Sequence, residues 1–592
     1  MAGFRVTPSV VSFTNDDILV GNPASRKKIQ NLENTVYDMK RLFGKSFLDE
    51  NVQRYMKYWP FKLLSSDPNN RDAAPIIEVR SSGNLLHQRP VDISAKVLRK
   101  MKETAELVVD TPITRAVITV PAYFNQAQKV ETREAANLAG LETMELITEP
   151  AAAAYAYGFD SLKYNKNKLL VFDLGGGTFD VSIIEVANGF FKVLAVGGDT
   201  NLGECDFDSA LFEHCNEKVK ELFGLDCSHD NNRKIRQLLL RKCEKLKINL
   251  SNSSKDSVYL GDLFAVVSSI DAEIIVTQDV FQQVCHSLLS KLMTITSETL
   301  KSANLKPSDI TEILLVGGCS RIPAISERLC KIFPGKKLNR AINVDEVVAY
   351  GAAVRAAQLC ENVKNEVPKI SLIEATPLSL GTDIGGGRFF PMILKNSQVP
   401  TKVEKSFCTG LNDQSSMRFQ IYEGERKLSL HNNLLGEFAI EGLSKGAARS
   451  TAVKFVFELD KNGILHARAS HQKTDGTSVH ASFDLNYNEK RTADMRSIEE
   501  MLRDAKIFEK EDQAEYDRKD ALIKLEVAIR KVQYEIANTV PHDRTFKETQ
   551  CRGYEDWIKQ NQDASKEVFE QKLKAFEIGL VIESDDEDDD SD

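Results

Sequence analysis

The sequence lacks the features that would place it in several large protein classes. No apolar run approaches the roughly 20 residues that cross a membrane as a helix, and no signal peptide opens the chain. The ten cysteines include no C-x-x-C pair, which argues against a zinc site or a disulfide framework. The nine histidines include no H-E-x-x-H, so nothing supports a metalloprotease. We therefore expect reduced thiols, no membrane contact and a cytoplasmic protein, with a nuclear location left open.

A strong charge of one sign is also absent from most of the chain. There are 77 Lys and Arg residues and 86 Asp and Glu residues, and eight of these acids lie in residues 583–592. The remainder is close to neutral, which excludes the electrostatic footprint of a nucleic-acid binder. At 592 residues the chain is too long for a single core, and we expect several domains.

The pattern of expected elements changes twice along the chain. Strand-like runs alternate with helical patterns up to about Cys360, which indicates an α/β region; examples are a strand at 116–120, a helix at 125–138, a strand at 313–316 and a helix at 323–332. Short alternating strands with frequent turn signals fill residues 376–483 and predict a β-sandwich. From Asn488 to about Phe576 the apolar residues follow helical spacing.

One segment of the α/β region carries a chemical signal. The apolar run 168–172 ends in Asp173, followed by Gly175, Gly176, Gly177, Thr178 and Asp180, and a second apolar run follows at 181–186. This pattern predicts a β-hairpin whose glycine turn leaves backbone N–H groups open to a phosphate. The two aspartates suit the water shell of a magnesium ion. The alternative is an ordinary glycine-turn hairpin.

Several motifs in the same order resemble the 70-kilodalton heat-shock chaperone family. They are the hairpin itself and residues 34–42, 120–125, 149–150, 198–203, 316–323, 345–353, 376–381 and 422–426. The resemblance implies an actin-like nucleotide-binding domain over 1–366, a linker over 367–375, a β-sandwich that binds peptides over 376–488, and a helical lid over 489–579. Residues 580–592 would be a disordered acidic tail.

The resemblance also implies roles for single residues in ATP and ADP binding. Lys40 is similar to the catalytic lysine, Thr178 belongs to the phosphate hairpin, and Glu149 and Asp173 are similar to carboxylates that hold Mg²⁺ through water. The remaining nucleotide contacts would come from Gly175, Gly176, Gly177, Asp180, Gly198, Gly203, Glu244, Lys247, Ser251, Gly317, Gly318, Arg321 and Asp345. Without that context Lys40, Lys247 and Arg321 would be read as surface charges, and Glu149 as a turn residue.

In the sandwich, Phe389, Met417 and Phe419 fall where the family lines its peptide cleft. Apolar side chains there would bind extended apolar segments of unfolded polypeptides. An ordinary sandwich core is an equally good interpretation of these three residues. J-domain co-chaperones and nucleotide-exchange factors are the partners that the resemblance implies.

The sequence departs from the family pattern at several places. An earlier phosphate hairpin with its own aspartate–glycine–threonine turn is missing before Arg5, and Glu204 stands where the family has a glycine near the phosphates. A carboxylate about 5 Å from a phosphate would cost about 3 kcal/mol at an effective dielectric near 20, unless it turns into solvent. Glu145 replaces an arginine that engages J-domain partners, and Lys129 replaces an arginine near Pro121.

Three hypotheses follow for function. The first is an ATP-dependent chaperone that assists folding and refolding. The second is an ATPase-impaired peptide-binding holdase or regulatory pseudo-chaperone. The third is an incomplete gene model of a normal chaperone. For the sequence as written, the missing hairpin and Glu204 predict weak nucleotide binding and slow hydrolysis.

Overall fold

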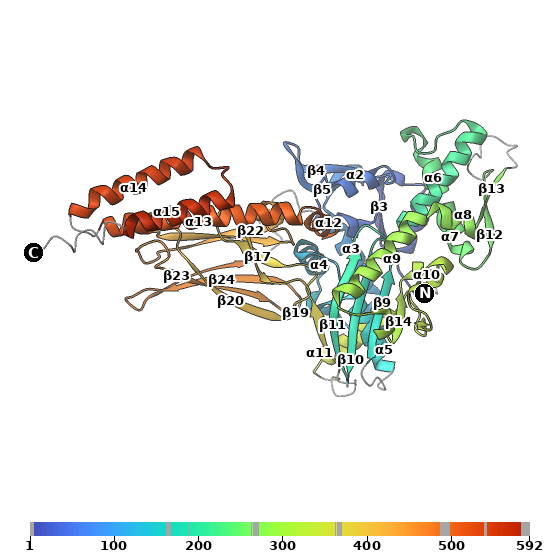
Figure 1. The fold of residues 1–592 in the computed structure, drawn as a ribbon. Coiled ribbons are helices and arrows are strands. Elements are labelled where there is room, and N and C mark those ends of the chain that lie inside the picture. Colours follow the sequence, from blue (N-terminus) through green and yellow to red (C-terminus); the bar gives the residue numbers. More distant parts are fainter. Residues whose placement is uncertain are drawn as a thin grey trace, which may run out of the picture.

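The structure is a computed structural model that describes residues 5–160, 167–187, 189–261, 263, 272–361, 363, 367, 370–485, 498–537 and 541–581. A mixed α/β region is followed by two packed β-sheets and by helices that extend along them to the C-terminal end (Figure 1). Among the described residues, no helix is both long and apolar enough to cross a membrane.

A seven-stranded sheet in the order β15-β14-β9-β10-β11-β16-β19 forms the centre of the α/β region. Alternate residues of β9 (Asn167–Leu174) enter two different cores, with Leu170 and Phe172 on one face and Leu169 and Val171 on the other. Both faces are therefore covered, as a near-continuous apolar run predicts. The other strands are β10 (Phe179–Ala187), β11 (Phe190–Asp199), β14 (Glu312–Val316), β15 (Lys337–Asn339), β16 (Ser371–Ala375) and β19 (Gln398–Val399).

Helices cover the two faces of this sheet. The helix α9 (His286–Ser302) contacts β10 and β11, while α5 (Glu149–Asp160) contacts β9 and packs on α11 (Val347–Leu359). The expected helix at 323–332 is present as α10 (Pro323–Ile332). An outer group consists of α6 (Glu204–Phe223), α7 (Arg233–Leu250), α8 (Gln278–Val284) and the hairpin of β12 (Lys255–Tyr259) and β13 (Glu273–Thr277).

A second part of the α/β region contains shorter sheets. The expected strand at 116–120 is present as β7 (Arg115–Val120), which pairs in parallel with β8 (Glu142–Thr148). These two make a two-stranded sheet, so among the described strands β7 has β8 as its one partner. The expected helix at 125–138 is α4 (Gln126–Leu138), capped by Asn125 and followed by Gly140 at φ 74°.

The remaining elements of this part lie before α4 in the sequence. They are β1 (Val10–Phe13), β2 (Ile18–Val20), α1 (Asn22–Lys27), β3 (Thr35–Tyr37), α2 (Glu50–Met56), β4 (Lys62–Asp67), β5 (Asn70–Ser81), β6 (Asn84–Gln88) and α3 (Pro90–Val109).

The expected β-sandwich is present as two four-stranded sheets, β18-β17-β21-β22 and β20-β23-β24-β25. Their facing sides share one core, in which Phe419, Phe455 and Phe457 are almost fully buried. The strands are β17 (Leu380–Asp383), β18 (Phe389–Ile393), β20 (Thr401–Cys408), β21 (Ser416–Glu423), β22 (Asn433–Glu441), β23 (Ala452–Leu459), β24 (Leu465–Gln472) and β25 (Ser478–Asp484).

The C-terminal helices are α12 (Ile498–Ile507), α13 (Glu509–Ile536), α14 (Pro541–Gln560) and α15 (Lys566–Val581). Figure 1 shows α13 running along the sandwich, and Arg426 forms a buried ion pair with Asp512 at 2.7 Å between Nη2 and Oδ1. Helix α15 ends at Val581, two residues beyond the expected limit at 579. Residues 489–497 of the expected lid and the acidic tail from 582 lie outside the described residues.

The sandwich and the α/β region are in direct contact through buried polar groups. The strand β16, just before the sandwich, pairs in parallel with β11, and the Glu423 carboxylate accepts a hydrogen bond from the Gln126 backbone N–H at 3.3 Å. The helix α12 also contacts the α/β region, where Glu499 accepts from the Thr200 backbone N–H at 2.7 Å. A buried carboxylate, Glu423, and a partly buried one, Glu499, therefore lie where the parts of the chain meet.

These contacts predict that docking depends on pH. Burial raises the pKa of Glu423 to about 7 although Lys129 opposes the shift, and burial together with Asp199 raises the pKa of Glu499 to about 7. A carboxyl group that is exposed on separation has a pKa near 4.3, so the docked form binds protons more tightly. The contact between the sandwich and the α/β region is therefore most stable below about pH 4.3 and weakens as the pH rises through about 7.

Small-angle X-ray scattering across this range should show the chain expanding between about pH 6 and about pH 8. Glu423→Gln should flatten part of the response because one titrating group is lost. The surface change Glu404→Gln on β20 is the matched control. A chain whose dimensions are the same throughout this range would contradict the prediction.

Candidate functional site

The predicted glycine hairpin is present and joins two central strands. β9 and β10 pair antiparallel, and Asp173 lies directly opposite Asp180 in the register. The Gly175 N–H donates to the Thr178 carbonyl at 3.0 Å, which closes a tight turn over residues 175–178. Residues opposite each other in an antiparallel pair project to the same face, so the two carboxylates lie side by side at the base of the turn.

The carboxylate cluster below the turn is buried and crowded with negative charge. Burial and the neighbouring Glu149 raise the pKa of Asp173 to about 8, while Lys40 opposes this shift. Burial together with Glu149 and Asp173 also raises the pKa of Asp180 well above its usual value. The Oδ1 atom of Asp180 accepts from the Tyr123 backbone N–H at 3.0 Å, but its buried Oδ2 has no partner in the described structure. A nearby cation would stabilise the ionised form of these buried carboxylates.

Lys40 is the cation that reaches the cluster from another part of the chain. Its Nζ lies 2.5 Å from Oε1 of Glu149, the first residue of α5. Burial alone would lower the pKa of Lys40, but Glu149 beside it outweighs this effect and raises the pKa. The lysine side chain is 46% exposed.

The donor set fits a hydrated magnesium ion. Asp173, Asp180 and Glu149 supply carboxylate oxygens, which Mg²⁺ prefers, and Oδ2 of Asp180 has no other partner within the described residues. Among the described residues, no group of three or more His, Cys, Asp or Glu side chains is arranged to ligate a metal directly. Because Mg²⁺ usually keeps several of its waters, these carboxylates would hold it largely through its water shell.

The glycine turn packs closely against the first residues of α6. The Glu204 N–H donates to the Gly175 carbonyl at 3.0 Å, and the Cys205 N–H donates to the Gly176 carbonyl at 3.1 Å. A Cβ atom on Gly203 would lie 2.6 Å from the Gly177 backbone, so only glycine fits. Gly198, on the neighbouring strand, is equally tight against the Phe179 carbonyl at 2.5 Å. The sequence motif therefore reflects close backbone packing at these positions.

Arg41 is a residue at this site that the sequence did not single out. Its side chain is 2% exposed, its Nη2 donates to Asp206 at 2.6 Å, and its guanidinium lies 4.1 Å from the centre of the Tyr55 ring. Its Nε and Nη1 atoms have no partner in the part of the chain that the structure describes. A Cβ atom on Gly177 would lie 3.1 Å from that Nε. Position 41 had no distinguishing sequence signal beyond following Lys40.

On the adenosine side, Glu204 forms an ion pair instead of turning freely into solvent. Its Oε1 accepts from Lys247 Nζ at 2.7 Å, and Asp208 accepts from the same Nζ at 2.8 Å. Burial alone would lower the pKa of Lys247, but the two carboxylates outweigh it and raise the pKa far above normal. Lys247 is thus held by two acids in this structure, and the Glu204 side chain is 34% exposed.

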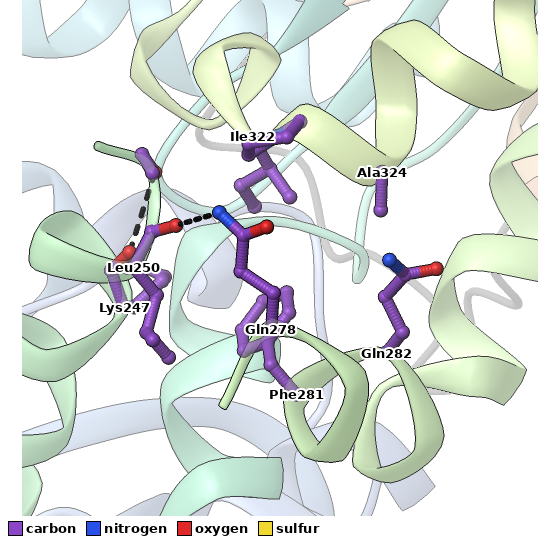
Figure 2. Close-up of a pocket in the computed structure, with 9 residues that line it drawn as sticks. Lys247, Leu250, Gln278, Phe281, Gln282, Ile322 and Ala324 are labelled. Atoms are coloured by element: carbon purple, nitrogen blue, oxygen red, sulfur yellow. Dashed lines mark hydrogen bonds between the residues drawn. The ribbon is translucent and has the colours of Figure 1, made fainter. Parts of the chain in front are cut away.

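Lys247 lines a small cavity with Gln278, Phe281 and Ile322, as Figure 2 shows. Ser251 belongs to the same lining. Gln278 closes one side by donating to the Leu250 carbonyl at 2.8 Å. The cavity holds about 10 Å³, which is room for about one water molecule. An adenine ring would therefore need this wall to open.

The other predicted adenosine residues lie in two places. Gly317 has φ 77°, and a Cβ atom at this position would clash with the Leu174 carbonyl. Glycine here therefore lets the end of β14 pack closely against the end of β9. Gly318 follows it, and Arg321 pairs with Asp345 at 2.6 Å. Glu244, by contrast, is exposed on α7 and lines a larger cavity of about 480 Å³ with Tyr37 and Asp38. The predicted set is therefore only partly brought together.

In the sandwich, the three predicted peptide-binding residues are buried. Phe419 stacks on Phe455 with ring centres 4.2 Å apart, and Met417 belongs to the same core. Phe389 is 5% exposed and packs against Gly381. These contacts suit the interpretation as sandwich core, and peptide binding by these residues stays a prediction.

Two of the departures from the family pattern are also buried. Glu145 is paired with Arg355 at 2.7 Å and is not displayed on the surface. Lys129 lies at the contact with the sandwich, where burial lowers its pKa although Glu374 and Glu423 oppose the shift.

Comparison with known proteins gives concordant results. A family model described as "Hsp70 protein" matches residues 1–582. The "Heat shock cognate 70 kDa protein 3" of Dictyostelium discoideum is 38% identical over 97% of this chain and 91% of its own length. The "Heat shock 70 kDa protein" of Neurospora crassa is 37% identical over 97% of this chain and 88% of its own. A ribosome-associated molecular chaperone of Eremothecium gossypii is 39% identical over 91% of this chain and 86% of its own.

Proposed function

Since this chain belongs to the Hsp70 family and is an ATP-dependent molecular chaperone, we propose that it binds ATP at the β9–β10 hairpin and uses it to control the binding of unfolded polypeptides. The observation that carries the nucleotide site is the buried carboxylate cluster beneath a glycine turn, with Lys40 and Glu149 paired beside it. Phosphoryl transfer needs this combination of a cation, carboxylates and close backbone approach.

Each residue has a distinct task in this proposal. Lys40 orients the attacking water and stabilises the charge that develops on the γ-phosphate, while Glu149 holds the lysine in place. Asp173 and Glu149 hold the water shell of Mg²⁺, which neutralises phosphate charge when bound. Thr178, Asp180 and the turn at 175–177 position the phosphates. Once the wall at Gln278 and Phe281 opens, the adenosine would contact Lys247, Ser251, Glu244, Gly317, Gly318, Arg321 and Asp345.

The sandwich would hold extended apolar segments of client polypeptides, with the helices α12–α15 acting as its lid. The ion pair of Arg426 with Asp512 and the contact of α13 with the sandwich support this arrangement. J-domain co-chaperones and nucleotide-exchange factors would be its partners, and its place would be the cytoplasm.

We further propose that Arg41 contacts the phosphates opposite the hairpin. Its Nε and Nη1, which have no partner among the described residues, are buried beside Gly177, and an anion there would satisfy them. Arg41→Lys keeps the charge but loses the fork of N–H groups, so we expect ATP and ADP to bind about tenfold more weakly. Adenosine should bind as before because it has no phosphate. Isothermal calorimetry with the three ligands measures this, and equal losses for adenosine and ATP would show that Arg41 has only a structural role.

The site as a whole is tested by titrating magnesium-ATP into the purified chain and following one turnover of labelled ATP. We expect saturable binding that Glu204 weakens, and slow but measurable hydrolysis. Asp173→Asn should reduce both, whereas the surface change Asp279→Asn on α8 should leave both unchanged. Binding without any hydrolysis would favour a nucleotide-sensing chaperone over an ATPase.

A further inference from the structure

A second large cavity lies outside the nucleotide site, between two separate parts of the α/β region. Its volume is about 470 Å³, which is within the range of small-molecule sites. One wall comes from the end of α2 and from β4 and β5, and includes Trp59 and Phe61; the other comes from the start of α7 and includes Arg233 and Arg236. A ligand here would touch both parts at once.

Arg236 is the buried polar group of this cavity. The residue is 3% exposed, and its Nη1 donates to the Lys57 carbonyl at 2.5 Å and to the Ser228 carbonyl at 3.2 Å. Its Nε has no partner among the described residues. The acid nearest to it, Asp230, is 3.8 Å away with a side chain that is 80% exposed. The guanidinium charge is therefore poorly compensated, and a buried unpaired N–H is costly.

The rest of the lining has a surplus of positive charge. Five Lys or Arg side chains line the cavity against three Asp or Glu side chains. Lys62 is paired with Glu78 at 3.0 Å, but the Arg233 pair with Glu33 is longer, at 3.5 Å, and half exposed. For Arg80 no ion pair is present within the described ranges. The cavity is thus suited to a ligand that carries negative charge.

The remaining wall is apolar and aromatic. Trp59 and Phe61 stack with ring centres 5.4 Å apart, and each is 5% exposed. The Trp59 Nε1 donates to Asp38 at 3.0 Å, so the indole is fixed in place. Aromatic rings next to guanidinium groups bind ligands that combine an apolar body with an anionic head.

We propose that this cavity binds an organic phosphate, that is, a phosphate monoester with an apolar or aromatic group. The phosphate would bind Arg80, Arg233 and Nε of Arg236, and the apolar group would pack near Trp59. Because Arg236 already joins α7 to the Lys57 carbonyl, a bound ligand would strengthen this junction. It would hold the two sides together and slow the release of ADP from the nucleotide site. This regulation goes beyond the proposed function.

The chain offers a fluorescent reporter for binding; because Trp59 also lines the neighbouring cavity that contains Glu244, the arginine variants described below assign the signal to this cavity. It contains two tryptophans, Trp59 in the cavity and Trp557 in α14, so Trp557→Phe leaves Trp59 as the single source of indole emission. In this full-length background, phenyl phosphate should change the emission in a saturable way. Phenol and inorganic phosphate should bind at least about tenfold more weakly, since each lacks one half of the ligand. No saturable change with phenyl phosphate would overturn the proposal, and equal binding of inorganic phosphate would show a simple anion site instead.

Two variants separate the site from general effects. Arg80→Gln and Arg233→Gln should each weaken phenyl phosphate binding about five- to tenfold, because each removes one charged contact. Arg115→Gln at the exposed start of β7 is the control and should bind normally. Stopped-flow release of a fluorescent ADP should slow when phenyl phosphate is present, and this effect should disappear in Arg233→Gln. If phenyl phosphate binds but leaves the rate of ADP release unchanged, the proposed regulation of ADP release is wrong. The binding test by Trp59 emission needs no nucleotide, so it remains valid even if the proposed nucleotide site is wrong.

Discussion

Replacing Lys40 with methionine is expected to slow ATP hydrolysis in a single turnover by about 10²- to 10³-fold, while ATP binding changes only a few-fold. The reason is that Lys40 places its ammonium group 2.5 Å from Glu149, beside the Asp173 and Asp180 carboxylates, where charge develops on the transferred phosphoryl group. Removing one preorganised charge contact from such a site costs about 3–4 kcal/mol in the transition state. Rapid quench of labelled ATP measures the rate.

Lys27→Met is the matched control, since Lys27 lies in α1 and its ammonium group bonds only to Gln30 in the described structure. It should hydrolyse ATP at the rate of the parent chain. If Lys40→Met hydrolysed ATP within about threefold of the parent, Lys40 would not be the catalytic lysine. If it lost ATP binding altogether, its role would be structural.

The second large effect is expected from Glu204→Gly, which should tighten ATP binding by about ten- to a hundredfold. At about 5 Å from a phosphate, the carboxylate would cost about 3 kcal/mol at an effective dielectric near 20. The ion pair of Glu204 with Lys247 and the partial exposure of the Glu204 side chain both reduce this cost. The expected gain in ATP affinity is therefore as small as about tenfold at the lower limit. The substitution also releases Lys247 from one of its two acidic partners.

Glu204→Gln separates charge from size, because it keeps the side-chain length and removes the charge. If repulsion between the Glu204 carboxylate and the phosphates dominates, Glu204→Gln should show most of the increase in ATP affinity expected for Glu204→Gly. Glu217→Gln, in the same helix and exposed, should leave ATP affinity unchanged. Calorimetric titration with magnesium-ATP decides this, and an unchanged affinity in Glu204→Gly would show that this carboxylate does not oppose nucleotide binding.

Much of the fold was accessible from local sequence patterns. The hairpin with its glycine turn at 175–177 and the helices expected at 125–138 and 323–332 follow from residue preferences and apolar runs, and the structure confirms all three elements. The mixed α/β region, the sandwich sheets and the C-terminal helices agree with the family assignment.

The parts that could not be predicted depend on which distant residues meet. Glu204 was expected to repel phosphate or turn into solvent, but its partner Lys247 is 43 positions away and appears only when α6 packs on α7. Arg41 has no local signal at all, since its burial is created by Tyr55 and Asp206. Likewise, Phe419 could line a cleft or fill a core, and only its stacking on Phe455 shows that it is buried in the core. Long-range pairing decides each of these cases.

The central claim is that ATP bound at the hairpin controls polypeptide binding by the same chain. The most direct measurement is the dissociation rate of a fluorescent extended apolar peptide from the purified full-length protein, with and without magnesium-ATP. Coupling between sites in proteins usually changes affinity by about 5- to 150-fold, and we expect ATP to speed peptide release within this range in the parent chain and more strongly at low ATP in Glu204→Gly. Peptide release at the same rate with and without saturating ATP in both proteins would contradict the account.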